Sequence, residues 1–157
     1  ILPGGESTPL EKLMRRFGLD VALRQALERG MACWGTCAGM ILLSQEIANA
    51  INGQTGLGHL PVKVVRNCFG RQVDSCETPL EIKGLQGEAF PAVFIRAPGV
   101  SDILDPQIEV LAHHQNMIVA VRYSRVLATS FHPELTGDNR LHRFFVEEIV
   151  GCKPVGR

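Results

Sequence analysis

A cysteine flanked by two glycines lies where a predicted strand meets a predicted helix, and this junction limits the folds open to the chain. The residues are Gly35-Thr36-Cys37-Ala38-Gly39. An apolar run of strand length, residues 31–34, precedes them, and residues 38–47 carry apolar side chains at helical spacing. Glycines lack Cβ, so strand and helix can approach closely while the central residue holds a strained backbone. The pattern predicts a nucleophile at Cys37, although a buried cysteine acting as a small hydrophobe fits it too.

The helix expected after Cys37 bears on the chemistry of the thiol. The first N–H groups of a helix have no partner within the helix, and they point toward the junction. They favour a thiolate and a neighbouring oxyanion by up to about 2 kcal/mol in good geometry. We therefore expect the Ala38 amide to donate to an oxyanion.

A partner base for the cysteine is offered by Ser130-Phe131-His132-Pro133-Glu134, which follows the β-rich run 126–129. Proline favours extended geometry in the residue before it, and residues i and i+2 of an extended segment point to the same side. Glu134 is thus predicted beside His132, where a carboxylate orients the imidazole of a nucleophile–base–acid triad. The alternative is a histidine that only ends a strand.

Composition limits the classes of function. The chain has 157 residues, 45% hydrophobic and 20% charged, which predicts one soluble domain over residues 1–157. The formal net charge is zero and no apolar run is long enough to span a bilayer, so we expect neither nucleic acid nor membrane as a partner. Five cysteines without a C-x-x-C pair argue against a disulfide framework and suggest a reducing compartment, the cytoplasm.

The first thirty residues predict a glycine loop and two helices. Residues 3–5 are Pro-Gly-Gly, a loop able to present N–H groups to a ligand, or an ordinary tight turn. Thr8 and Glu11 predict a capping box at the first helix, and a second helix begins near Asp20. The expected inward stripe of the first helix consists of Leu10, Leu13, Met14 and Phe17.

The remaining segments alternate between strands and loops. The sequence predicts a surface loop over 48–60, strands at 62–65 and 91–95, a polar segment at 66–75, a hairpin from 108–112 and 117–123, and a final helix from Asp138 to Val150. Together with the junction at Cys37, this order predicts an α/β fold: a mostly parallel sheet flanked by helices in three flavodoxin-like layers, with a small antiparallel hairpin.

Three polar groups in these segments are candidate ligand contacts. Arg66 has the planar fork that binds a carboxylate, although a solvated arginine fits as well. Arg96 follows a buried strand, and ligands bind at strand ends in this architecture. His113 and His114 are adjacent in an extended turn and point apart, with no third ligand in sight, so we expect no metal site.

Five motifs taken together resemble one family closely: Leu2-Pro-Gly-Gly-Glu-Ser-Thr8, Gly35-Thr-Cys-Ala-Gly39, Asn67-Cys-Phe-Gly-Arg-Gln-Val-Asp-Ser75, Phe94-Ile-Arg-Ala-Pro98 and Ser130-Phe-His-Pro-Glu-Leu-Thr136. In order and spacing the chain is similar to the glutaminase subunit of pyridoxal 5'-phosphate synthase, a triad glutamine amidotransferase. The resemblance implies a glutamine amidotransferase-like fold and hydrolysis of L-glutamine, with the ammonia passing to a partner synthase in a heteromeric complex and no bound cofactor.

The resemblance also implies roles for single residues. Cys37 corresponds to the nucleophile, His132 to the base and then acid, and Glu134 to the orienting carboxylate. Contacts to glutamine are implied for Gly4, Gly5, Glu6, Arg66, Ile95 and Arg96. With the Ala38 amide, the Gly4-Gly5 loop supplies the candidate oxyanion donors, Gly5 foremost.

One departure from the family concerns the start of the chain. The family has a strand and helix before its Pro-Gly-Gly loop, and here the chain opens at Ile1-Leu2. We expect an N-terminally incomplete domain. Two alternatives to the glutaminase stay open at this point: a stand-alone γ-glutamyl hydrolase using the same triad, and a non-catalytic interaction module whose pocket is unformed.

Overall fold

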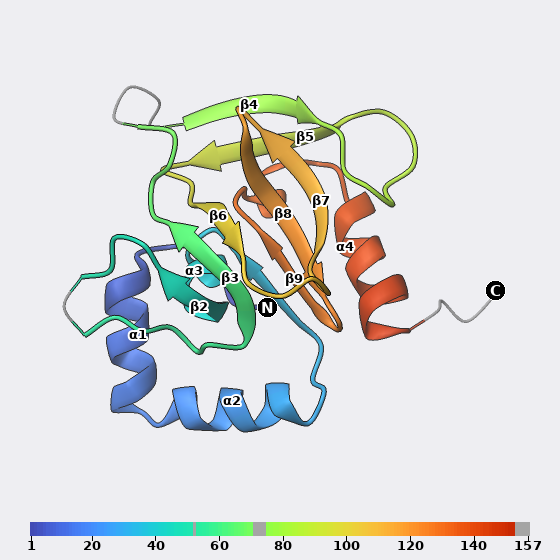
Figure 1. The fold of residues 1–157 in the computed structure, drawn as a ribbon. Helices are drawn as coiled ribbons and strands as arrows, with labels where there is room; N and C mark the ends of the chain where they lie inside the picture. Colours follow the sequence, from blue (N-terminus) through green and yellow to red (C-terminus); the bar gives the residue numbers. More distant parts are fainter. Residues whose placement is uncertain (52, 71–74, 153–157) are drawn as a thin grey trace.

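The computed structural model describes residues 1–51, 53–70 and 75–152 (Figure 1). Its helices are α1 (Ser7–Arg16), α2 (Leu19–Glu28), α3 (Ala38–Leu43) and α4 (Arg140–Phe144), with a 3₁₀ turn η1 (Pro133–Leu135) and a π-helical segment η2 (Phe145–Val150). Its strands are β1 (Cys33–Thr36), β2 (Ser44–Ile47), β3 (Leu60–Val65), β4 (Ser75–Leu80), β5 (Phe90–Ile95), β6 (Gly99–Ile103), β7 (Glu109–His114), β8 (Met117–Tyr123) and β9 (Val126–Thr129).

The main sheet has the order β1-β9-β8-β6-β3-β2, and β7 pairs with β8. Pairing is parallel between β1 and β9 and between β2 and β3, and antiparallel in the part built from β3, β6, β7, β8 and β9. Leu2 adds a parallel bridge to Gly35 of β1. The strands beside the Cys37 junction are therefore parallel, and their carboxyl ends meet at one edge.

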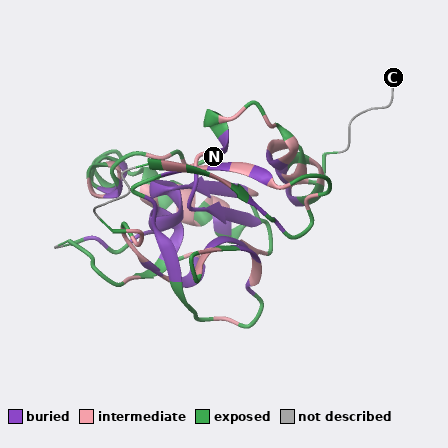
Figure 2. Cartoon of the chain, turned by 90° about the horizontal axis from the view of Figure 1, so that it is seen from above, coloured by how far each residue is buried: buried purple, intermediate pink, exposed green. Residues whose placement is uncertain are grey.

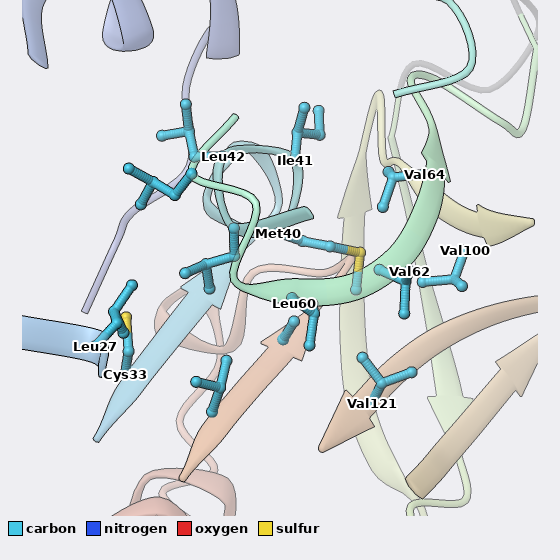
Figure 3. Close-up of a cluster of buried hydrophobic side chains, with 14 of the residues drawn as sticks. Leu27, Cys33, Met40, Ile41, Leu42, Leu60, Val62, Val64, Val100 and Val121 are labelled. Atoms are coloured by element: carbon cyan, nitrogen blue, oxygen red, sulfur yellow. The ribbon is translucent and has the colours of Figure 1, made fainter. Parts of the chain in front are cut away.

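Two apolar clusters cover the sheet. In the first, Met14 of α1 and Leu27 of α2 pack with side chains of α3 and β3, among them Met40, Leu60 and Val62 (Figure 3). The second combines aromatic residues of β5 with the end of the chain, α4 and η2. Figure 2 shows the buried residues along the strands and the exposed ones on the outer helices and loops. Burial on both faces explains why strands such as β9 are wholly apolar apart from Thr129.

The predicted α/β fold class is confirmed, and so is the hairpin. β7 and β8 pair antiparallel across Gln115 and Asn116, both with positive φ (48° and 66°), as a tight two-residue turn needs. A second antiparallel pair, β4–β5, was not predicted, and neither was β6. Of the polar segment predicted at 66–75, residues 71–74 lie outside the described residues.

The prediction that the helix after Cys37 continues to residue 47 was wrong. α3 ends at Leu43, and Ser44 is extended (ψ 152°) at the start of β2. Three carbonyls at this end accept backbone hydrogen bonds from residues far along the chain: Leu42 from Leu57 N–H, Leu43 from His59 N–H and Ser44 from Gly58 N–H. These bonds satisfy acceptors that a helix end leaves unpaired, so a distant segment ends the helix.

The predicted capping box of α1 was also wrong. The helix starts at Ser7, its N-cap is Glu6, and no side chain caps it. The Oε1 atom of Glu11 instead accepts from the N–H groups of Thr55 (3.0 Å) and Gly56 (3.2 Å) and from Arg15 (2.6 Å). The segment predicted as a surface loop thus packs on α1, with Gln54, Gly56 and Leu57 buried.

Three smaller predictions differ from the structure. The strand expected at 31–34 is found at Cys33–Thr36. The final helix begins at Arg140 rather than Asp138, and it continues from α4 through η2 to Val150, the predicted end. In the predicted stripe of α1, Met14 is buried, but Leu13 and Phe17 are 51% and 70% exposed, so the stripe was partly wrong.

Glu11 predicts a measurable contribution to stability. Glu11→Ala should lower the free energy of unfolding by about 2–3 kcal/mol, because it leaves two backbone N–H groups of the 55–56 turn without their acceptor and removes one acceptor of Arg15. Lys12→Ala, at an exposed position of the same helix, is the control and should change it by less than about 0.5 kcal/mol. Urea denaturation of both variants measures the difference; equal midpoints would contradict this role for Glu11.

Candidate active site

Cys37 lies between β1 and α3 in a backbone conformation that side chains rarely adopt, with φ 51° and ψ −108°. Such a conformation costs about 1–3 kcal/mol and persists only where the surroundings enforce it. Here the Cys37 N–H donates to the Thr129 carbonyl at 2.8 Å, which ties the junction to the end of β9. The predicted sharp turn at the cysteine is thus present.

The two flanking glycines permit this turn because backbone fills the space a side chain would need. A Cβ on Gly35 would lie 2.6 Å from the carbonyl carbon and oxygen of Gly39, and a Cβ on Gly39 would overlap the Leu2 carbonyl oxygen. The same oxygen accepts from the Thr36 N–H at 3.0 Å. Strand, helix and the first residues of the chain therefore pack backbone to backbone around Cys37.

His132 reaches the same edge of the sheet because β1 and β9 are parallel and in register. Thr36, the residue before the cysteine, pairs with Thr129, three residues before the histidine. Phe131 is fully buried and contacts the rings of Phe90 and Phe94 at centroid distances of 5.8 and 5.6 Å. The His132 N–H donates to the Val93 carbonyl at 2.8 Å, which fixes the backbone of the histidine.

The imidazole of His132 contacts Glu134. Nδ1 lies 2.7 Å from Oε1, and the side chain of His132 is 12% exposed. The contact forms where the chain turns into η1, rather than along the extended segment that the sequence predicted. A carboxylate at Nδ1 leaves Nε2 to act as the base of the ring.

Gly4 lies against both the histidine and the cysteine. A Cβ at this glycine would be 2.5 Å from Cε1 of His132 and 3.5 Å from Cβ of Cys37. The separation of Cε1 of His132 from Cβ of Cys37 therefore cannot exceed the sum of 2.5 Å and 3.5 Å. The glycine loop thus closes over the gap between the candidate nucleophile and the candidate base.

A cavity of about 390 Å³ opens at Cys37. It is lined by Gly5, Glu6, Ser7, Cys37, Ala38, Ile41, Asn49, Arg66, Asn67 and Arg96. Five of the predicted site residues are thus brought to one cavity around the cysteine: Gly5, Glu6, Ala38, Arg66 and Arg96. The predicted Ile95 contributes its carbonyl, which lies 3.8 Å from the Cys37 sulfur, whereas Gly4, His132 and Glu134 stand beside the cavity.

Four lining residues were not singled out from the sequence: Ser7, Ile41, Asn49 and Asn67. Ser7 directly follows the glycine loop and Asn67 follows Arg66, so neighbourhood in sequence was a usable signal for both. Ile41 sits one helical turn after Cys37. Asn49 carried no signal, because only the folded chain brings residues 48–50 to Arg66.

The thiol of Cys37 is protonated in this structure at neutral pH. Burial raises its pKa to about 11, against a lowering by hydrogen bonds from the N–H groups of Ala38 and Gly5 and a further raising by the charge of Glu134. The N–H groups at the helix start lower the pKa of the thiol, as the sequence predicted, but desolvation raises it by more. Deprotonation of Cys37 therefore requires a base.

No metal site or membrane span emerges from the described part of the chain. Within it, no three side chains of His, Cys, Asp or Glu are grouped to hold a metal ion. His114 instead stacks on Phe94 at 4.9 Å between ring centroids. Among the helices described, none is long and apolar enough to cross a bilayer.

The high pKa of Cys37 predicts how its alkylation depends on pH. Without substrate, the thiolate fraction should still rise above pH 9, where about one Cys37 thiol in a hundred is ionised, since that pH is two units below its pKa. Iodoacetamide labelling, followed for the Cys37 peptide by mass spectrometry, measures this fraction. A rate that already levels off below pH 9 would contradict a buried, protonated thiol.

Comparisons with known proteins lead to one family. The sequence model of the SNO glutamine amidotransferase family matches residues 1–151. Curated relatives named "Pyridoxal 5'-phosphate synthase subunit PdxT" are 52% identical in Acidothermus cellulolyticus, over 96% of this chain and 74% of the relative, and 50% identical in Dehalococcoides mccartyi, over 98% and 79%.

Among solved structures, one described as "Crystal structure of glutamine amidotransferase" superimposes with a TM-score of 0.86 at 49% identity. The match covers 96% of this chain and 77% of that chain. Sequence and structure thus lead to the same assignment: this chain belongs to the SNO glutamine amidotransferase family.

Proposed function

We propose that this protein hydrolyses L-glutamine to L-glutamate and ammonia at Cys37 and delivers the ammonia to a pyridoxal 5'-phosphate synthase subunit. Membership of the glutamine amidotransferase family supports the reaction, and the names of relatives at about half identity support the destination of the ammonia. The observation that carries the proposal is the meeting of Cys37, Gly4 and the His132–Glu134 pair beside a cavity.

The charges around the cavity suit a free amino acid. Arg66 and Arg96 supply guanidinium groups for an α-carboxylate, and Glu6 supplies a carboxylate for an α-ammonium group. A ligand held at both charged groups directs its side chain toward Cys37. Specificity for glutamine over glutamate is expected at the sulfur, because a second carboxylate is disfavoured beside a buried thiol and Glu134.

The first chemical step is proton transfer and attack. Nε2 of His132 takes the proton of the Cys37 thiol, and Glu134 stabilises the imidazolium that results. The sulfur then forms a bond to the carboxamide carbon of glutamine. Because the thiol rests protonated, this proton transfer precedes the attack.

Attack places a negative charge on the former carbonyl oxygen. The N–H groups of Ala38 and Gly5, which already face the sulfur, are the proposed donors to this oxyanion. Gly5 has φ 137°, a region open to glycine, so its amide orientation depends on the residue type. Loss of one donor of this kind costs about 10²–10³ in kcat.

Collapse of the intermediate breaks the carbon–nitrogen bond as the imidazolium of His132 protonates the departing amine, giving ammonia and a Cys37 thioester. Water, deprotonated by the same imidazole, then attacks the thioester and releases glutamate. The thiol regains its proton, so one water is consumed for each glutamine.

The partner is proposed to be the synthase subunit named in the relatives, acting with this chain in the cytoplasm. No observation favours the stand-alone γ-glutamyl hydrolase. The interaction-module alternative required an unformed pocket, whereas Cys37 lines a cavity. We therefore retain the glutaminase alone.

Cys37→Ala should abolish ammonia release from glutamine, because it removes the atom that forms the thioester. The assay is coupled ammonia detection with the synthase subunit present. Cys152→Ala, which changes an exposed cysteine at the end of the described chain, is the control and should retain full activity. Turnover by Cys37→Ala at the wild-type rate would refute the assignment.

Gly4→Ala should lower kcat at least 10²-fold without unfolding the protein, because the new Cβ would collide with the His132 imidazole and displace the base. Gly137→Ala is the matched control, since a Cβ there meets no atom within 4 Å. Steady-state kinetics and thermal melting of both variants test this. An active Gly4→Ala enzyme would show that His132 does not work from the position described.

A further inference from the structure

Asn49 lines the cavity at Cys37, although it lies in a segment predicted as a surface loop. It follows β2 by two residues, and its side chain reaches the backbone of Arg66. Oδ1 accepts from the Arg66 N–H at 3.0 Å, and Nδ2 donates to the Arg66 carbonyl at 3.3 Å. One side-chain amide thus pairs with both polar groups of a single residue.

These two bonds continue the pairing of β2 with β3 beyond its last backbone bond, in which the Ala48 N–H donates to the Val64 carbonyl at 2.9 Å. The carboxamide has the donor and acceptor of a peptide group and replaces the next strand residue. Arg66 is therefore held at a defined place just outside the sheet.

The held residue stands where the chain changes direction. β3 ends at Val65, and Asn67 has φ 48°, a left-handed conformation in which the chain turns. Arg66 and Asn67 both line the cavity at this turn. On the other side of this turn, the Cys68 N–H donates to the Ala97 carbonyl at 3.0 Å. With both flanks fixed, the direction in which the Arg66 side chain leaves the backbone is fixed as well.

We propose that Asn49 is a positioning residue that aims the Arg66 guanidinium at the α-carboxylate of glutamine. The inference rests on the proposed glutamine site and deepens it. Aspartate in this place would accept from the Arg66 N–H but could not donate to its carbonyl, and it would bring a negative charge to a cavity that receives a carboxylate.

A double-mutant cycle tests the proposal, with ammonia release measured on the full chain in the presence of the synthase subunit. Asn49→Ala should raise KM for glutamine about tenfold and leave kcat within about twofold, because it weakens binding without touching the reacting atoms. In an Arg66→Ala background the same substitution should change KM less than about twofold, since the group that it positions is already gone.

Two further variants serve as a control and as a replacement for Asn49→Ala. Asn139→Ala, which removes an exposed asparagine whose side chain caps no helix, should leave KM unchanged. If Asn49→Ala fails to fold, Asn49→Ser takes its place in the cycle, because it removes the paired carboxamide without adding a charge to the cavity.

The outcomes distinguish the role of Asn49 from the substrate contact of Arg66. A raised KM for Asn49→Ala that vanishes in the Arg66→Ala background supports the proposal. Additive effects, or an unchanged KM for Asn49→Ala beside a raised KM for Arg66→Ala, overturn the role of Asn49 alone. An unchanged KM for Arg66→Ala overturns the proposed substrate contact on which that role depends.

Discussion

The rest of the structure depends on one close approach of three backbone segments. The carbonyl of Leu2 lies against Gly39, and Gly39 lies against Gly35, in space that any side chain would occupy. This contact allows the strained backbone of Cys37, which a less constrained turn would relax. The buried helix α3 and the parallel strand β9 complete the surroundings. A catalytic function built on Cys37 therefore rests on glycines that carry no chemistry of their own.

The Cys37 thiol is buried, but polar groups surround it, and this combination suits a nucleophile that is deprotonated only during the reaction. Desolvation keeps the Cys37 thiol protonated, while two backbone amides and a carboxylate-bound imidazole stand around it. A thiol that is neutral at rest is protected from casual oxidation and alkylation, because the thiolate is the reactive form.

The α/β fold class and the sharp turn at Cys37 could be predicted from the sequence, whereas contacts between distant segments could not. The turn at Cys37 follows from a local rule about glycine, and the contact of His132 with Glu134 was predicted from their spacing, although it forms at the start of η1 and not in an extended segment. The end of α3 at Leu43 was not, because residues 57–59 satisfy its carbonyls from a distance. The donors to Glu11 and the two hydrogen bonds between Asn49 and Arg66 were missed for the same reason. The raised pKa of Cys37 also depends on packing, which periodicity does not reveal.

In the proposed reaction, Cys37 attacks the side chain of glutamine while the amides of the glycine loop and of α3 hold the oxygen. A crystal structure of the protein treated with a chloroketone analogue of glutamine can show this arrangement, since the sulfur displaces chloride and traps the ligand. We expect a carbon–sulfur bond at Cys37, the ketone oxygen at the N–H groups of Gly5 and Ala38, and the ligand carboxylate at Arg66. An analogue bonded to another cysteine, or one at Cys37 with its oxygen turned away from both amides, would contradict it.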